Sequence, residues 1–419
     1  MVLLHFEDKE FAMKKDIIKL AAGAATMLMI STSADASYTL KKRVGDVDTK
    51  LSLFGFAQLE AVGGEGMQIK SAGSAKKADA SIAFRAQRIR LGWKYVAGNV
   101  RGKVFIDFNQ KSQDPVKTDG AALPNYIKDA FISYKFNNAF IPKLGLIKMP
   151  NGMSFTIPGW NLDIAERGFD KPLMLERNMG LMISGRGIGG TGNKVNGFEM
   201  GHDRAWTGFG YDVMVANQAS RSKAANSSEM GGNSYAIRGM FDYTEALHVE
   251  ASYGLSENAG GFNAADATLN ANANKNENYS NINVGIDSNL QELSLKAEYT
   301  QAHNIKGIKD YDETTYTATA GYFVMPNLEL VAKTIQGTAT KGTDADTTSL
   351  GNTYVGFNLF LSQPHSDFSR GAKKGRNQHK ILFNYIVTNG TGASEGKDKW
   401  TGLSGYRADA FIAQYQFKF

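Results

Sequence analysis

The sequence predicts an all-β fold: a 16-stranded antiparallel transmembrane β-barrel with long external loops and an inward-folded third loop. Three observations predict it. The chain begins with an export-type segment, and no later apolar run is long enough for a membrane-spanning helix, which needs roughly 20 residues. Sixteen segments alternate apolar and polar residues, as barrel strands do. Their connections alternate between long and short, and the last segment ends in a bare aromatic residue, Phe419.

The export signal comes first along the chain. Residues 13–36, MKKDIIKLAAGAATMLMISTSADA, combine a basic start, a short apolar run and an A-x-A sequence. This order is typical of a secretory signal peptide, and we expect cleavage after Ala36. Residues 1–12 hold acidic side chains that are unusual ahead of such a run, so we interpret them as an over-extended start. Residues 37–419 are then expected to form a single outer-membrane β-barrel domain.

The composition agrees with an exported all-β protein. The 419 residues include 45 Gly, 24 Phe and 17 Tyr but only 8 Pro, a balance that suits many strands and turns. The absence of Cys excludes a disulfide scaffold and a cysteine-ligated metal site. The formal net charge of +6 makes the chain mildly basic.

Two-residue periodicity identifies the strands. In LHVEASYGLS, Leu247, Val249 and Tyr253 fall on one face, whereas His248 and Glu250 fall on the other. The same alternation predicts sixteen strands at residues 50–61, 80–95, 100–108, 126–136, 140–148, 179–187, 206–217, 234–243, 246–255, 280–288, 292–302, 314–325, 327–337, 348–361, 378–388 and 406–419. An even number of strands suits a single-chain bacterial barrel.

The connections support the same fold independently. The long ones are residues 62–79, 109–125, 149–178, 218–233, 256–279, 303–313, 338–347 and 389–405. The others are mostly tight turns, and long outer loops with short periplasmic turns are the arrangement of outer-membrane barrels. Two connections, 188–205 and 362–377, break the rule. Either they are real excursions or a strand is misplaced there.

The last predicted strand decides between a membrane barrel and a soluble secreted β-protein, whose strands also alternate. In IAQYQFKF, Tyr415, Phe417 and Phe419 share one face. A terminal Phe behind alternating aromatics resembles the signal that the barrel-assembly machinery reads, so we expect these side chains to face lipid. Lipid offers no hydrogen bonds, so every strand must be paired in a closed sheet. Charged side chains must then face an aqueous lumen.

Basic residues gather on the inner face of the second and third predicted strands, ASIAFRAQRIRLGWKY and NVRGKVFIDFNQ. The alternation turns inward Arg88, Arg90, Lys94, Arg101 and Lys103. A bulge near Gln87 would turn Arg85 inward too, and Arg238 faces inward on a later strand. Clustered cations attract anions, and guanidinium groups suit oxyanions such as phosphate. The pattern favours a porin with anion preference.

A general non-specific porin is the alternative within this class. Inward-facing acids on later strands would then lie opposite the basic residues of the second and third predicted strands, which we call the basic wall. Together they would create a transverse field without strong selectivity. These acids are Glu250, Asp287, Glu298 and Glu329.

The longest connection, MPNGMSFTIPGWNLDIAERGFDKPLMLERN, is the third external loop. It holds Arg167, Lys171 and Arg177 among large apolar residues such as Trp160 and Phe169. Because a loop this apolar is unsuited to open water, we expect it to fold into the barrel as a constriction. A latch between subunits is the alternative.

These segments resemble a known family, the phosphate-selective porins of the O and P type. FRAQRIRLGW resembles its arginine-rich second strand, IKDAFISYKF its fourth, and PKLGLIKMPNGMS the strand that leads into its third loop. The resemblance covers residues 50–187. It implies a 16-stranded homotrimer whose lumen carries an arginine ladder and a lysine cluster for anions. The chain departs from the family at Ala86, where a second Arg often stands, and at residues 151–153, where Asn-Gly-Met replaces the usual Phe-Gly.

Readings of other classes have little support. An outer-membrane enzyme would need Ser, His and an orienting Asn or Asp converging at the rim, but the His residues are scattered without a nucleophile motif. An adhesin-like barrel would need larger outer loops. We expect a passive channel with no catalytic residue, cofactor or metal. Its expected partners are other copies of the chain, outer-membrane lipid and lipopolysaccharide, small anions such as phosphate, and the assembly machinery at Phe419, but no nucleic acid.

Overall fold

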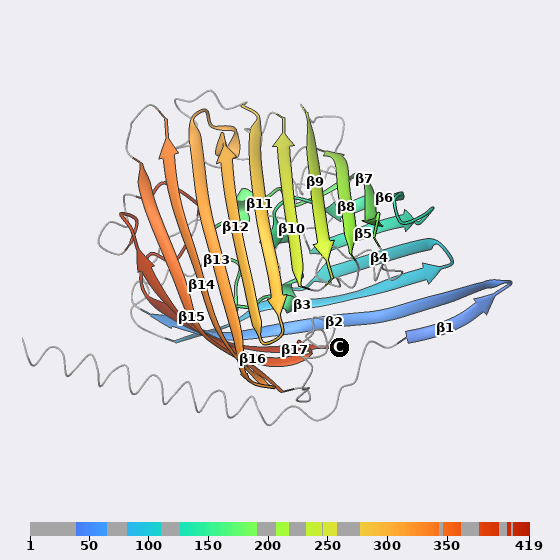
Figure 1. Cartoon of the computed structure of the whole chain (residues 1–419), viewed down its shortest axis with the longest axis horizontal. Coiled ribbons are helices and arrows are strands. Elements are labelled where there is room, and N and C mark those ends of the chain that lie inside the picture. The colour runs from blue at the N-terminus through green and yellow to red at the C-terminus, as the bar shows by residue number, and fades with distance from the viewer. Residues whose placement is uncertain are drawn as a thin grey trace, which may run out of the picture.

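The described part of the chain forms one antiparallel sheet of seventeen strands in the computed structural model (Figure 1). The structure describes residues 39–64, 82–109, 126–190, 207–217, 232–244, 246–257, 277–342, 347–361, 377–393, 400–403 and 405–419. The expected signal peptide at residues 13–36 and the expected over-extended start at 1–12 lie outside these ranges.

Sixteen strands close into a barrel, because the last of them pairs with the first. They are β2 (Val47–Gly64), β3 (Ala83–Ala97), β4 (Val100–Asp107), β5 (Ile127–Tyr134), β6 (Ile141–Lys148), β7 (Arg177–Ile188), β8 (Gly208–Asn217), β9 (Asn233–Tyr243), β10 (Leu247–Ser256), β11 (Tyr279–Leu290), β12 (Leu293–His303), β13 (Tyr311–Met325), β14 (Leu328–Lys341), β15 (Thr348–Phe360), β16 (His379–Asn389) and β17 (Ala410–Lys418). Each corresponds to one predicted segment, so the predicted barrel is confirmed.

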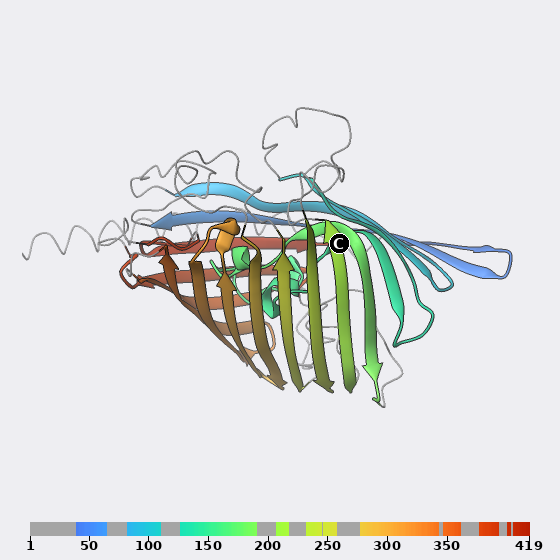
Figure 2. The same cartoon turned by 90° about the horizontal axis from the view of Figure 1, so that it is seen from above.

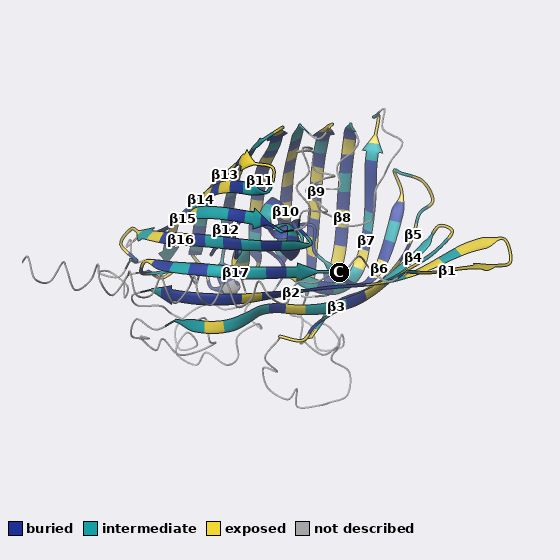
Figure 3. Cartoon of the chain, turned by 90° about the horizontal axis from the view of Figure 1, so that it is seen from below, coloured by how far each residue is buried: buried dark blue, intermediate teal, exposed yellow. Residues whose placement is uncertain are grey.

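Side chains alternate between the two faces of the barrel, which appear in Figure 3 as alternating buried and exposed bands. Val249 and Leu295 are 37% and 42% exposed, whereas Glu250 and Glu298 on the same strands are buried. The outer face is therefore apolar and the inner face polar, as a barrel in lipid requires.

The barrel closes at the C-terminal strand. β17 pairs with the second half of β2, and Phe419 exchanges two backbone hydrogen bonds of 3.0 Å with Gly55. Gln414 and Gln416 point inward and are buried, and Tyr415 and Phe417 alternate with them on the outer face. The terminal aromatic stretch is thus a sheet strand with its rings outward.

One strand was not predicted. β1 (Thr39–Val44) turns back on the start of β2, so that Lys41 lies opposite Lys50. This exposed hairpin extends beyond the neighbouring strands (Figures 1 and 2). The sequence of β1, TLKKRV, lacks the apolar alternation that identifies strands facing lipid. Most of its side chains are exposed.

The connections follow the predicted pattern. Only Gly98 and Asn99 join β3 to β4. The two connections that break the predicted pattern, 188–205 and 362–377, have the predicted strands on both sides, so no strand was misplaced there. The centres of those connections, residues 191–206 and 362–376, lie outside the described ranges. The short helical turns in the described ranges are α2 (Met153–Thr156), η1 (Gly159–Asn161), η2 (Lys171–Leu173) and η5 (Ile305–Gly307). Within the described residues, no helix has the length and apolar character needed to cross a membrane.

Candidate pore constriction

Loop 3, residues 149–176 between β6 and β7, packs against one side of the barrel interior and carries α2, η1 and η2 (Figure 2). Two apolar clusters fix it there. One joins Phe155 and Leu173 of the loop to Tyr279 of β11, and the other joins Phe169 to Ile335 of β14. Because these contacts are buried, part of the lumen is a packed core and loop 3 is held as a firm internal wall.

Polar contacts fix the loop backbone to three further strands, β12, β16 and β2. The Ser154 amide donates to Glu298 at 3.0 Å, and Lys380 donates to the Leu162 carbonyl at 2.8 Å. On the closing strands, Gln58 donates to the Gly159 carbonyl at 3.0 Å. These inward-facing side chains satisfy backbone groups that would otherwise be buried without partners.

A cavity of about 270 Å³ remains between loop 3 and strands β3 to β6. Its lining includes nine basic and three acidic side chains, an excess of six positive charges. We call it the basic constriction. Its charged residues are Arg88, Arg90, Lys103, Asp107, Lys128, Asp129, Lys143, Lys148, Arg167, Lys171, Glu176 and Arg177.

The wall side of the basic constriction carries cations that share few acids. Asp129 binds both Lys103 at 2.9 Å and Arg177 at 2.7 Å. Asp107 binds Arg90 at 2.9 Å and approaches Lys128 at 3.8 Å. One carboxylate between two cations leaves a net positive charge on this side of the cavity.

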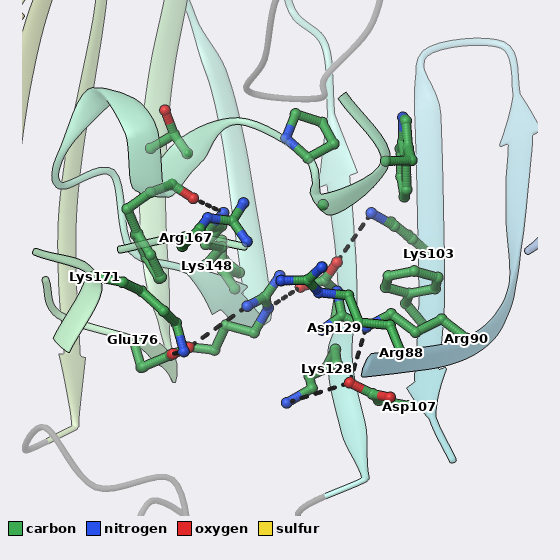
Figure 4. A pocket seen from close by; sticks show the side chains of 18 of the residues that line it. Arg88, Arg90, Lys103, Asp107, Lys128, Asp129, Lys148, Arg167, Lys171 and Glu176 are labelled. Atoms are coloured by element: carbon green, nitrogen blue, oxygen red, sulfur yellow. Dashed lines mark hydrogen bonds and ion pairs between the residues drawn. The ribbon is translucent and has the colours of Figure 1, made fainter. Parts of the chain in front are cut away.

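The loop side is basic too. Figure 4 shows Arg167 and Lys148 converging on the side of the cavity opposite Arg90 and Lys103. Arg167 donates to the carbonyls of Ser154, at 3.3 Å, and Ile157. Burial lowers the pKa of Arg167 well below its ordinary value, and nearby arginines, Arg88 first among them, lower it further. An anion between the two sides would relieve this repulsion.

Two acids of loop 3 point away from the basic constriction, whereas a third, Glu176, lines it. Asp163 pairs with Lys296 of β12, and Glu166 pairs with Arg85 and accepts a hydrogen bond of 3.0 Å from Tyr406. The loop therefore presents its cations to the cavity and turns these two carboxylates toward the surrounding strands.

The acids of the later strands have partners of their own. Glu250 pairs with Arg238 at 3.4 Å and with His248 at 2.9 Å. Glu298 binds loop 3 at Ser154, as described above, and Glu329 accepts from Asn358 at 2.9 Å. None of these acids is among the residues described around the cavity.

Six of the ten predicted site residues line the basic constriction. They are Arg88, Arg90, Lys103, Arg167, Lys171 and Arg177. The extra residue of a bulge is Gln87, as predicted, because the register of β2 and β3 shifts between the Arg88 and Ala86 pairings. Arg85 consequently turns inward, where Glu60 binds it at 2.8 Å.

The other predicted residues are not part of the described cavity lining. Arg238 is buried against Asp212 at 2.6 Å. Lys94 lies 4.7 Å from the ring centre of Phe54 and opposite Lys103. Arg101 precedes Lys103 by two residues on β4 and lies opposite Val96. Lys94 and Arg101 therefore continue the basic wall toward the short turn between β3 and β4.

Three lining cations were missed: Lys128, Lys143 and Lys148. Lys143 alternates with exposed Leu144, so its inward direction could have been predicted. Lys128 is the extra residue of a bulge between β4 and β5, which leaves it beside buried Asp129, and no sequence pattern marks that bulge. Lys148 enters the cavity where β6 ends and loop 3 begins.

Replacing Gly152 by alanine should destabilise the barrel by about 1–2 kcal/mol and loosen loop 3. Gly152 precedes α2 with φ of +82°, and an added Cβ would lie 2.3 Å from the sulfur of Met174. Denaturant unfolding and open-channel current noise are the measurements. The matched control is Gly189→Ala, where φ is +71° but nothing lies within 4 Å of the added Cβ. Equal current noise in the two variants would contradict a role of Gly152 in loop 3.

Comparisons with known proteins agree with this architecture. The profile of the phosphate-selective porin O and P family matches residues 67–350, and no curated protein matches the sequence. An anion-selective porin from Comamonas acidovorans has a similar structure, with a TM-score of 0.55 and 12% identity, covering 88% of this chain and all of that one. The trimer form of OmpT, an outer membrane protein of Vibrio cholerae, gives a TM-score of 0.53 at 12% identity, covering 88% and 99%. The chain is an outer-membrane porin, a channel rather than an enzyme, and it belongs to the phosphate-selective porin O and P family.

Proposed function

We propose that this porin lets small anions diffuse in preference to cations, and that phosphate-like oxyanions bind briefly in the basic constriction. The observation that supports the proposal is that basic side chains lie on both sides of the cavity, on the strands and on loop 3. Together they give an excess of six positive charges in its lining. A cation there meets repulsion from loop and wall together, whereas an anion is attracted by both.

A non-specific porin with a transverse field is less well supported. Such a field needs acids on one side of the constriction and bases on the other. Here the loop acids Asp163 and Glu166 are paired with basic residues of the strands, and Glu298 binds the loop backbone. Glu176 does line the cavity, but Lys171 binds it at 2.9 Å. The arrangement supports a constriction that is mainly positive on both sides.

The side chains also suggest how an oxyanion passes. Arg88, Arg90, Arg167 and Arg177 bring guanidinium donors to one small cavity, and these can replace the water around phosphate. Asp129 already binds two of the lining cations, so it competes with the bound anion and favours its release. Passage requires binding strong enough for entry and weak enough for exit.

The functional unit we propose is an exported homotrimer. Residues 13–36 would direct export, and residues 37–419 would form the mature barrel in outer-membrane lipid and lipopolysaccharide. The outward aromatic residues that precede Phe419 support its recognition by the barrel-assembly machinery. The family match supports self-association, and the Vibrio cholerae protein of similar fold has a trimer form.

Planar-bilayer recording of the purified porin tests the proposal. In a potassium chloride gradient, the reversal potential should have the sign of chloride permeation, and millimolar phosphate should reduce the chloride current. A cation-selective reversal potential would overturn the anion preference. An anion-selective channel whose chloride current ignores phosphate would overturn the phosphate preference alone.

A further inference from the structure

Aromatic rings lie beneath many of the cations in the basic constriction. Lys103 lies 5.1 Å from the ring centre of Phe105, and Lys143 lies 4.8 Å from that of Phe131. The guanidinium of Arg90 lies 5.7 Å from the Phe105 ring. Each distance is within the range at which the negative face of a ring attracts a cation.

Loop 3 repeats this arrangement with a single ring. Phe155, on α2, has Lys148 4.3 Å and Arg167 5.9 Å from its ring centre. Its side chain is 2% exposed, so it does not offer a free face to a solute. Lys148 also donates to the carbonyl of Phe155, as Arg167 does to those of Ser154 and Ile157. Both cations are therefore held by neutral groups.

The kind of group that holds each lining cation determines the electric field in the pore. A carboxylate would hold the same cations but would cancel their charge, as Asp107 does in part for Arg90. A ring face or a carbonyl oxygen attracts a cation through a quadrupole or a dipole and leaves its full charge to act on a passing solute. Burial of the ring beside the cations strengthens this attraction, because little water screens it.

We propose that Phe155 is a specificity-determining positioning residue: its ring holds Lys148 and Arg167 facing the basic wall without neutralising them. Phe105 and Phe131 also lie beside cations of the strands, but Arg90 and Lys103 over Phe105 have carboxylate partners as well. The inference rests on the proposed anion preference, because it explains how the positive field of the constriction is maintained.

Phe169 is the matched comparison within the same loop. It is 1% exposed and packs edge-on against Trp400 at 5.9 Å, in the other apolar cluster of loop 3. Phe155 and Phe169 therefore contribute similarly to the burial that fixes the loop, but Phe155 also lies beneath two cations. Parallel substitutions separate apolar packing from attraction of a ring for charge.

The experiment compares the full porin with Phe155→Leu, Phe155→Tyr and Phe169→Leu in planar bilayers. Phe155→Leu should lower the chloride-over-potassium permeability ratio about threefold to tenfold, since the loss of a desolvated cation–π contact lets both cations move. Phe155→Tyr keeps the ring and should restore most of the selectivity. Phe169→Leu should leave selectivity near the wild-type value, even if it lowers the unfolding temperature.

A ring of unchanged shape provides the decisive variant. Trifluorophenylalanine at position 155 keeps the packing but removes most of the negative charge of the ring face, so selectivity should fall as it does in Phe155→Leu. Unchanged selectivity in this variant and in Phe155→Leu, with a wild-type channel that is anion-selective, would overturn the inference. A wild-type channel without anion selectivity would instead overturn the proposed function on which it rests.

Discussion

Replacing Arg167 by glutamine should lower the anion-over-cation permeability ratio of the channel by about tenfold. Arg167 projects from loop 3 toward the basic wall, and Arg88 and Arg90 contribute to the electrostatic environment that lowers its pKa. A unit charge at roughly 6 Å and an effective dielectric constant of about 20 changes the energy of a passing ion by a few kcal/mol. Reversal potentials in a salt gradient give the ratio directly.

The variant should also weaken block by phosphate, because glutamine keeps the length but loses the fork of charged donors. The matched control is Arg43→Gln. Arg43 lies on the exposed β1–β2 hairpin with a 69% exposed side chain, 3.7 Å from Asp46. A similar loss of selectivity in both variants would show that net charge, not the position of Arg167, sets the preference.

The barrel could be predicted because one physical rule acts on every strand. Lipid outside and water inside sort side chains with a period of two, so segments such as Leu247–Ser256 are visible in the sequence. The same rule predicted the inward direction of Arg88 and the bulge at Gln87, because without the bulge Phe84 would face the lumen. Most side chains of strand β1 are exposed, so the sorting of side chains between lipid and water does not act on it.

Pairing inside the lumen could not be predicted by periodicity. The alternation shows that Arg85, Arg90 and Arg238 share one face, but not which carboxylate each of them meets. Arg85 and Arg238 meet carboxylates brought together by loop folding and strand register, Glu166 in one case and Asp212 in the other. These contacts depend on tertiary structure.

The direction of the loop 3 acids has the largest consequence for function. The loop 3 sequence contains four acids and two bases, and this composition does not by itself decide between a transverse and a uniform field. Asp163 meets Lys296, and Glu166 meets Arg85, so both carboxylates turn to the strands while Arg167 turns to the cavity. The charge that loop 3 presents to the cavity is therefore a property of how the loop packs, more than of its composition.

Replacing Val284 by arginine should reduce the folding free energy of the barrel in lipid vesicles by about 2–4 kcal/mol. Val284 is 44% exposed on the outer face of β11, midway along an apolar row that also contains Ile282 and Ile286. A charge there must be buried in acyl chains or reach the interface by bending its side chain, and both cost free energy. Urea unfolding in vesicles measures the loss.

Depth within the membrane provides the control for this prediction. Leu290 is on the same outer face at the end of β11, opposite Leu293 beside the short turn. Arginine at this position can reach water, so Leu290→Arg should cost no more than about 1 kcal/mol. Equal costs at both positions would mean that the apolar row of β11 does not face lipid, and the outward assignment of Ile282 and Ile286 would fail with it. A larger cost at Val284 fixes the orientation on which the basic constriction depends, since the alternation that turns Val284 out on β11 also turns Arg88 in on β3.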